Sequence, residues 1–276
     1  MYKRQEGDDG YRVYVNGEKV IDYWGEHASA KREYTLKAIA GTDYKIRIEY
    51  MQAGAEALLR FDLGVYRHIS PEMVVDRVKE ADIVIFAGGI SPSLEGEEMY
   101  SVNSPGFAGG DRTSIELPQV QRDILKALKK AGKKVVFVNC SGSAVALVPE
   151  MESCDAILQA WYPGQAGGLA VADVLFGDFN PSGKLPVTFY KNTDQLPDFE
   201  DYSMKNRTYR YMTEVPLFPF GYGLSYTTFD ISKGRLNKKT ISAGQGLNFK
   251  VNVKNTGKYD GAEVIQVYAV SYTHLT

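Results

Sequence analysis

Ile83-Val84-Ile85-Phe86-Ala87-Gly88-Gly89 is followed closely by Glu95-Gly96-Glu97-Glu98. The apolar run predicts a buried strand, and the glycine pair lets the backbone turn sharply out of it. In an open α/β sheet, the carboxyl ends of the strands are where ligands bind. Clustered carboxylates can hold one of their number protonated, as a general acid must be. A solvated acidic loop is the alternative interpretation.

Helix and strand signals alternate along the middle of the chain. Ser70-Pro71 is a helix start, because serine caps the first turn and proline fits the first helical position. Such alternation predicts a parallel sheet covered by helices on both faces, with its strand ends on one rim. Strands are expected at residues 82–87, 134–139 and 156–162, and helices at residues 70–81, 118–131, 143–151 and 167–175.

Both flanks of this region predict β structure. Residues 8–66 contain alternating strands, two of them joined by the hairpin signal Asn16-Gly17. Near the other end, residues 247–253 alternate and another strand is expected at residues 264–268. These last strands look like the opening half of an immunoglobulin-like sandwich, which could not bury both faces if it stopped there.

The composition favours a neutral partner and carboxylate chemistry. Lys and Arg total 32 against 34 Asp and Glu, so nothing points to nucleic acid or to an anionic membrane. Three histidines and two cysteines give little from which to build a Ser-His-Asp triad or a zinc site. We therefore expect no metal and no organic cofactor. Ser141 lacks the Gly-x-Ser-x-Gly elbow and is interpreted as a turn residue.

The two ends of the chain share an unusual property. Residues 1–5 and 270–276 can be encoded by opposite orientations of one short DNA sequence, similar to a sequencing-library adapter. We interpret both as tags to be left out of the fold. The native sequence is then expected to cover residues 6–269 and to be cut at both sides.

Three long motifs follow one another in the second half of the chain. They are Trp161-Tyr162-Pro163-Gly164-Gln165-Ala166-Gly167-Gly168, then Ala172-Asp173-Val174-Leu175-Phe176-Gly177-Asp178-Phe179-Asn180-Pro181-Ser182-Gly183-Lys184-Leu185-Pro186-Val187-Thr188-Phe189, and Phe218-Pro219-Phe220-Gly221-Tyr222-Gly223-Leu224-Ser225-Tyr226. These motifs resemble the C-terminal signatures of family 3 glycoside hydrolases. The resemblance covers residues 67–269, and residues 8–24 resemble the closing half of a PA14 domain, which some members carry as an insertion.

The resemblance implies the fold class and the domain boundaries. It implies a parallel-sheet α/β sandwich domain at residues 67–226. This domain would be flanked by the C-terminal half of an all-β PA14-like domain at residues 6–66 and by the start of a fibronectin-III-like β-sandwich at residues 227–269. The family architecture also includes a (β/α) barrel, which this chain does not contain.

The resemblance also implies a mechanism. Family 3 enzymes are retaining hydrolases with an aspartate nucleophile on the barrel and a glutamate acid/base on the sandwich domain. Retention requires the two carboxyl groups to lie about 5 to 5.5 Å apart. The chain alone is therefore expected not to hydrolyse a glycoside. The family's Glu-x-Glu pattern matches Glu95-Gly96-Glu97, which makes Glu97 the first choice for the acid/base, Glu95 the second and Glu98 the third.

Asp111 and Arg112 mark a departure from the family pattern. An Asp-Arg pair often lies three residues beyond the acid/base, but here residues 99–110 intervene. Either this glycine-rich insert loops out and returns, or the acid/base assignment is wrong. Asp111 and Arg112 are candidates for sugar binding, with a structural ion pair and loop anchor as the other interpretation. Trp161 is a candidate for stacking on a sugar, with a core position as its alternative.

The functional hypothesis is a fragment of a β-glucosidase or β-xylosidase that acts on plant-type oligosaccharides and is periplasmic or secreted. The alternative is a carbohydrate-binding fragment without chemistry, built on residues 6–66. A flavodoxin-like nucleotide binder is disfavoured, because Ala87-Gly88-Gly89-Ile90 lacks the Gly-x-Gly-x-x-Gly spacing.

Overall fold

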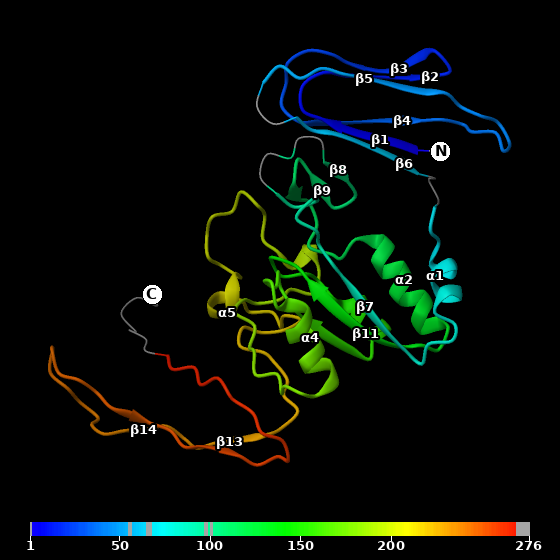
Figure 1. Cartoon of the computed structure of the whole chain (residues 1–276). Helices are drawn as coiled ribbons and strands as arrows, with labels where there is room; N and C mark the ends of the chain where they lie inside the picture. The colour runs from blue at the N-terminus through cyan, green and yellow to red at the C-terminus, as the bar shows by residue number, and fades with distance from the viewer. Residues whose placement is uncertain (1, 55–56, 65–67, 97–98, 100–101, 269–276) are drawn as a thin grey trace. The chain divides into compact units, whose positions relative to one another are not determined.

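The computed structural model describes residues 2–54, 57–64, 68–96, 99 and 102–268. The chain divides into two compact units, Met1–Ile69 and Ser70–Thr276 (Figure 1). Among the described residues, the first unit contains strands only, and all the helices lie in the second. None of the described helices has the length and apolar character needed to cross a membrane.

The first unit consists of two three-stranded antiparallel sheets, ordered β4-β1-β6 and β3-β2-β5. The predicted hairpin turn at Asn16-Gly17 joins β2 to β3, and both turn residues have positive φ. Residues 2–5 of the first predicted tag lie in β1, and residues 270–276 of the second lie outside the described residues. Neither observation tests whether these segments come from an adapter, so their origin stays a prediction. The strands are β1 (Tyr2–Gly7), β2 (Tyr11–Val15), β3 (Glu18–Tyr23), β4 (Ala30–Thr35), β5 (Ile46–Tyr50) and β6 (Leu59–Gly64).

A small core and one buried carboxylate hold this unit together. Tyr11 and Val13 of β2 are buried and form the centre of its apolar cluster. Asp9, in the turn before β2, accepts hydrogen bonds from the backbone N–H groups of Ala53 at 2.7 Å and His27 at 3.3 Å. The Ala53 bond is the largest cause of the lowered pKa of Asp9. Asp9 therefore ties two distant loops to β2.

A parallel sheet of order β12-β11-β7 organises the second unit and confirms the predicted parallel pairing. Val135 and Phe137 of the central strand are fully buried, and they share one core with Leu125 and Leu128 of helix α2. Each strand begins within a residue or two of its predicted position. The strands are β7 (Ile83–Gly89), β11 (Lys134–Cys140) and β12 (Ala156–Gln159).

Most helices begin where their start signals predict. The Ser70 side chain accepts a hydrogen bond from the Met73 N–H, so it caps α1 as expected. One helix starts later than predicted, at Val148, because the preceding residues form a turn whose carbonyls accept bonds from arginine side chains. The helices are α1 (Pro71–Arg77), α2 (Gln119–Lys130), α3 (Val148–Ser153), α4 (Gly167–Phe176), the 3₁₀ helix η1 (Thr193–Gln195) and α5 (Thr208–Tyr211).

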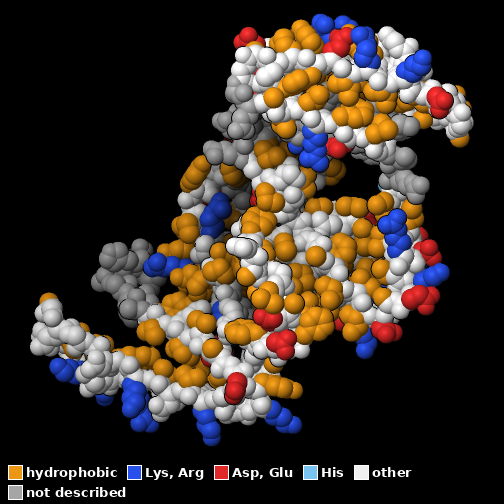
Figure 2. Space-filling model, viewed as in Figure 1, with side chains coloured by type: hydrophobic (Ala, Val, Ile, Leu, Met, Phe, Trp, Pro, Cys, Tyr) orange, Lys and Arg blue, Asp and Glu red, His pale blue; other side chains and the backbone are white. Residues whose placement is uncertain are grey.

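The edge strand β7 is covered on one side only. Val84 and Phe86 pack against the core, whereas Ile83 and Ile85 are 56% and 51% exposed. The three parallel strands lie side by side in the order in which they follow one another along the chain. Right-handed crossover connections between such strands place the connecting helices on the same face of the sheet. The prediction of two covered faces is therefore wrong for β7 within the described residues. Figure 2 shows many apolar side chains on the viewed surface of the second unit.

The last part of the second unit is a narrow antiparallel ribbon. β13 (Phe229–Ile231) pairs with β16 (Val253–Asn255), and β14 (Arg235–Leu236) pairs with β15 (Phe249–Lys250). The predicted strand at residues 264–268 does not form, because no described segment pairs with it. The predicted strand at residues 247–253 is also interrupted, since residues 249–250 and 253–255 pair with different strands. The described ribbon does not close into a sandwich.

A buried ion pair joins α2 to α3. Arg122 Nε lies 3.0 Å from Glu150 Oε1, and the Glu150 side chain is only 1% exposed. Burial raises the pKa of Glu150, and the charge of Arg122 opposes that rise. Arg122 also donates to the Ala146 carbonyl at 3.0 Å, which ties the turn after β11 to the same helix.

We expect Arg122→Met to lower the free energy of unfolding by about 3 kcal/mol or more, because Glu150 would stay buried without its counter-charge. Lys129→Met is the matched control, since the Lys129–Asp155 pair is exposed and such pairs contribute about 1 kcal/mol or less. Denaturant unfolding monitored by circular dichroism measures both. Equal losses in the two variants would contradict a special contribution from the buried pair.

Candidate active site

The ends of β7 and β11 approach each other closely at Gly89 and Cys140. Gly89 has φ +120°, and a Cβ there would lie 1.9 Å from the Cys140 carbonyl oxygen, so no other residue fits. The Gln121 side chain of α2 donates to the Gly89 carbonyl at 2.7 Å and accepts from its N–H at 2.8 Å. These contacts direct the chain from β7 into the acidic loop.

A buried polar network lies beneath this rim. Asn139 and Ser141 are fully buried, and the Asn139 amide donates to Gln159 Oε1 at 2.6 Å. Ser141 Oγ accepts from Gln159 at 3.1 Å and donates to the Ser143 carbonyl at 2.9 Å. Ser141 thus shapes the turn after β11, in agreement with its predicted role as a turn residue.

The glycine-rich insert loops out and returns. It forms a small antiparallel meander of β8 (Asn103–Ser104), β9 (Phe107–Ala108) and β10 (Asp111–Arg112). At its end, the Gly110 carbonyl accepts a hydrogen bond from the Gly96 N–H at 3.2 Å. Gly110 has φ +92°, and a Cβ there would lie 2.0 Å from the Gly96 carbonyl oxygen. The acidic loop and Arg112 are thereby brought together despite the intervening residues.

Arg112 is anchored on the turn after β11 and faces Glu95. Its NH1 donates to Ser143 Oγ at 2.8 Å and to the Ala144 carbonyl at 3.0 Å, and its Nε donates to the Ser114 carbonyl at 3.3 Å. Ser143 Oγ in turn donates to Glu95 Oε1 at 3.4 Å. Burial lowers the pKa of Arg112, and the negative charge of Glu95 opposes this change. One hydroxyl therefore connects the guanidinium to the carboxylate.

Two further features complete the electrostatics of this site. Arg112 NH2 is buried and has no hydrogen-bond partner among the described residues. The Tyr162 hydroxyl donates to the Ile90 carbonyl at 2.8 Å. Burial raises the pKa of Tyr162, and the charge of Glu95 raises it further. The rim can therefore offer a guanidinium N–H and a neutral phenol beside a carboxylate.

The remaining predicted site residues are distributed unevenly. Glu97 and Glu98 lie outside the described residues. Asp111 is exposed in β10, and no ion pair between Asp111 and Arg112 occurs among the described residues. Arg112 anchors its loop through Ser143 instead. Trp161, at φ +57°, packs edge to face on Phe189 with ring centroids 6.0 Å apart. That position at the edge of the core matches the alternative given for Trp161.

Sequence patterns did not single out Ser143, Tyr162 or Glu116 as site residues. Ser143 and Tyr162 both follow the carboxyl ends of parallel strands. This position in the sequence could have identified them as candidate site residues, because ligands bind at that edge of a parallel sheet. The described part of the chain contains no group of three or more His, Cys, Asp and Glu residues that could hold a metal ion.

Glu116 joins the segment after Arg112 to helix η1. Its carboxylate accepts from the Thr193 N–H at 2.9 Å, from the Thr193 hydroxyl at 2.5 Å and from the Ser114 hydroxyl. Burial alone would raise the pKa of Glu116, but these hydrogen bonds outweigh it and bring the pKa to about 2. The carboxylate is therefore ionised at neutral pH.

Comparison with known proteins identifies the family of this chain. Residues 11–226 match the glycosyl hydrolase family 3 C-terminal domain. The chain therefore belongs to glycosyl hydrolase family 3. It is 54% identical over 266 residues to a xylan 1,4-β-xylosidase of Xylanibacter ruminicola, covering 95% of this chain and 30% of that protein. It is 41% identical to a periplasmic β-glucosidase of Salmonella typhimurium, over 74% of this chain and 27% of that protein.

Solved structures show the same relationship. A β-glucosidase from Kluyveromyces marxianus in complex with glucose superposes with a TM-score of 0.63 at 27% identity, covering 94% of this chain and 32% of that one. The β-glucosidase EmGH1 from Erythrobacter marinus gives a TM-score of 0.57 at 36% identity over 68% of this chain and 24% of that chain. The chain thus spans about a third or less of the length of these relatives.

The low pKa of Glu116 predicts a specific acid sensitivity. Its folded-state pKa lies below its unfolded value, so its contribution to stability is present above about pH 4.5 and is lost as pH falls towards 2. We expect Glu116→Gln to lower stability at pH 7 and to flatten the fall in stability between pH 4.5 and 2. Denaturant midpoints across this range measure the effect. An acid profile unchanged by the substitution would contradict the assignment.

Proposed function

We propose that this chain supplies the acid/base carboxylate of a retaining β-glycosidase acting on β-glucosides or β-xylosides of plant-type oligosaccharides. Its membership of the family and the names of its relatives support the class of reaction. The observation that carries the proposal is the contact of Ser143 with both Glu95 and Arg112, which holds the acidic loop at the sheet rim.

Glu95 and Glu97 have different roles in this proposal. The Glu95 carboxylate accepts a hydrogen bond from Ser143, whose hydroxyl is also held by Arg112. A general acid must instead be free to reach the glycosidic oxygen and give up its proton as the leaving group departs. We therefore assign loop positioning to Glu95 and acid/base catalysis to Glu97. Arg112 NH2, buried and without a described partner, is the N–H we assign to a sugar hydroxyl, with Asp111 and Trp161 as further candidates.

The reaction follows from two carboxylates on opposite sides of the sugar. Glu97 gives its proton to the glycosidic oxygen while an aspartate attacks the anomeric carbon, which breaks the bond to the leaving group and forms a covalent glycosyl-enzyme. Glu97 then removes a proton from water, whose oxygen displaces the aspartate and restores the free enzyme. The aspartate belongs to a barrel domain outside this sequence, so this chain by itself is inactive.

The proposal extends to the flanking regions and to the location of the protein. Residues 6–66 are the closing half of a PA14-like domain, residues 67–226 the sandwich domain, and residues 227–269 the start of a fibronectin-III-like domain. The compact, all-strand first unit and the antiparallel ribbon support the two flanks. A periplasmic or secreted location is proposed from the name of the Salmonella typhimurium relative.

The acid/base role can be tested by grafting residues 70–226 into a full-length family 3 relative. We expect Glu97→Gln to lower kcat/KM about 10²- to 10⁴-fold on a disaccharide, whose leaving group needs protonation. The loss on an activated aryl glycoside is expected to be much smaller, because that leaving group departs without a proton. Steady-state kinetics with the two substrates measure the difference.

Two matched variants separate the neighbouring carboxylates. Glu98→Gln is expected to retain near-normal activity. Glu95→Gln is expected to reduce activity on both substrates alike, since it loosens the loop rather than removing the proton donor. Unchanged disaccharide hydrolysis in Glu97→Gln, with a leaving-group-dependent loss in Glu95→Gln, would transfer the acid/base role to Glu95.

A non-catalytic carbohydrate-binding role for residues 6–66 is the second candidate. One observation favours it: Trp24 is 43% exposed, and the Arg12 guanidinium lies 4.4 Å from the centre of its ring. If this role is correct, Trp24→Ala should abolish oligosaccharide binding measured by calorimetry. A triple Gln replacement of Glu95, Glu97 and Glu98 should then leave binding unchanged. The opposite pattern would reject this candidate.

A further inference from the structure

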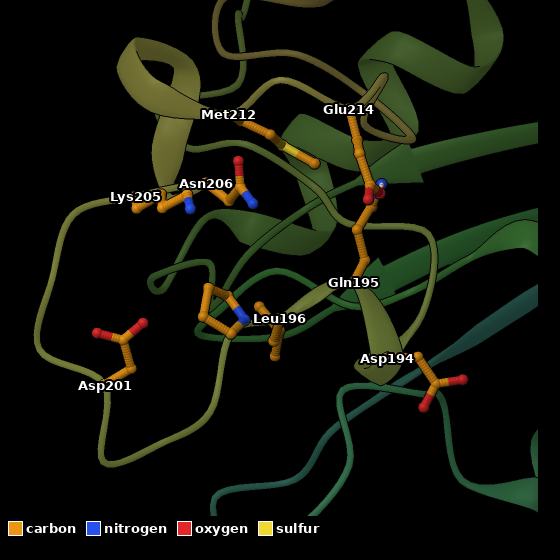
Figure 3. Close-up of a pocket in the computed structure, with 9 residues that line it drawn as sticks. Asp194, Gln195, Leu196, Asp201, Lys205, Asn206, Met212 and Glu214 are labelled. Carbon is orange, nitrogen blue, oxygen red and sulfur yellow. Dashed lines mark hydrogen bonds between the residues drawn. The ribbon is translucent and has the colours of Figure 1, made fainter.

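A cavity of about 330 Å³ lies beside helices η1 and α5, and its lining includes none of the strand-end residues described above. Figure 3 shows its lining side chains arriving from three segments, with Met212 on one side, Leu196 on another and Asp201 on a separate loop. The volume lies within the range of small-molecule sites in proteins. The cavity is thus large enough for a short saccharide.

The loop that bounds this cavity is rigidly built. Arg207 donates to three carbonyl oxygens, those of Ser203 at 3.1 Å, Asp198 at 3.1 Å and Asp201 at 2.5 Å. The Asn206 side chain accepts from the Thr213 hydroxyl at 3.0 Å. A loop ordered before binding loses less conformational entropy when a ligand arrives. The cavity is therefore preorganised rather than formed by the ligand.

The lining has the mixed chemistry that a sugar ring needs. Leu196, Pro197 and Met212 supply an apolar surface for ring C–H groups. Lys205, Asn206 and Asp201 supply a hydrogen-bond donor, an amide and an acceptor around it. Asp194 also borders the cavity, but Figure 3 shows its carboxylate turned away from the other side chains. This combination suits a ligand with both apolar faces and hydroxyl groups.

The charges exclude one class of ligand. Asp201 and Glu214 oppose a single cation, Lys205, so the cavity repels anions. Glu214 is held in place by the Gln195 amide, which donates to it at 3.1 Å. The described carboxylates do not gather closely enough to hold a metal ion. A neutral polyhydroxylated ligand remains the best match.

The same loop displays two aromatic rings. Phe199 is 91% exposed and Tyr202 is 89% exposed, although each ring has substantial apolar area to bury. The wall formed by η1 is bonded through Thr193 to Glu116, in the segment that follows Arg112. The cavity is thus joined to the proposed catalytic segment by hydrogen bonds.

We propose that this cavity is a second binding site for a neutral oligosaccharide, with Tyr202 and Phe199 extending the contact beyond it. The choice of a β-linked gluco- or xylo-oligosaccharide rests on the proposed function. The binding itself does not require the acid/base residue. The site would hold a part of a saccharide chain that is not being cleaved.

Calorimetry on the whole chain with xylotriose and cellotriose tests this site. Tyr202→Ala and Lys205→Ala are expected to weaken binding of one of these sugars at least tenfold, and both side chains are exposed enough to be replaced without unfolding the chain. A trimer of galacturonic acid is expected to bind more weakly than either neutral sugar. Absence of binding, or normal affinity in both variants, would overturn the proposal.

Two control variants locate any binding that occurs. Phe176→Ala alters an exposed aromatic residue beside a different cavity, and Trp24→Ala alters one in the first unit. Both variants are expected to bind the oligosaccharide with normal affinity. A loss of affinity in either variant would show that the sugar binds elsewhere and would overturn the proposal. The kinetics of Glu97→Gln in the grafted enzyme test the acid/base proposal without measuring binding at this cavity. Failure at this cavity and failure of the acid/base proposal are therefore measured separately.

Discussion

The close approach of β7 to β11 at Gly89 and Cys140 is the constraint on which the site depends. Only a residue without Cβ lets the Ile90 N–H reach the Cys140 carbonyl at 2.8 Å. The Gln121 side chain of α2 hydrogen-bonds to both the N–H and the carbonyl of Gly89, so both α2 and the sheet fix the backbone conformation at this residue. The direction in which the chain enters the acidic loop follows from this contact.

A second closure acts on the other end of that loop. Gly96 and Gly110 meet across residues 99–110, and the meander between them returns Arg112 to the turn after β11. Ser143 then connects Arg112 to Glu95. The insert separates Glu95 from Arg112 in sequence but not in space. A loop anchored at both ends needs little reorganisation when a ligand binds.

Three glutamates in this unit illustrate how surroundings decide what a carboxylate does. Glu116 receives hydrogen bonds from Thr193 and Ser114, and its pKa falls to about 2. Glu150 is buried against one arginine, and burial raises its pKa. Glu95 meets a guanidinium through a hydroxyl. The near balance of charge over the whole chain says nothing about these local differences, because burial, neighbouring charges and hydrogen bonds act on each carboxylate separately.

The sequence by itself determined the features that local hydrogen bonding and periodicity control. These include the cap at Ser70, the hairpin at Asn16-Gly17 and the alternation that produces parallel strands with one polar rim. Only the tertiary structure decided the return of the insert, the partner of Arg112 and the uncovered side of β7. Those outcomes depend on contacts between residues far apart in the chain, and side-chain periodicity carries no information about such contacts.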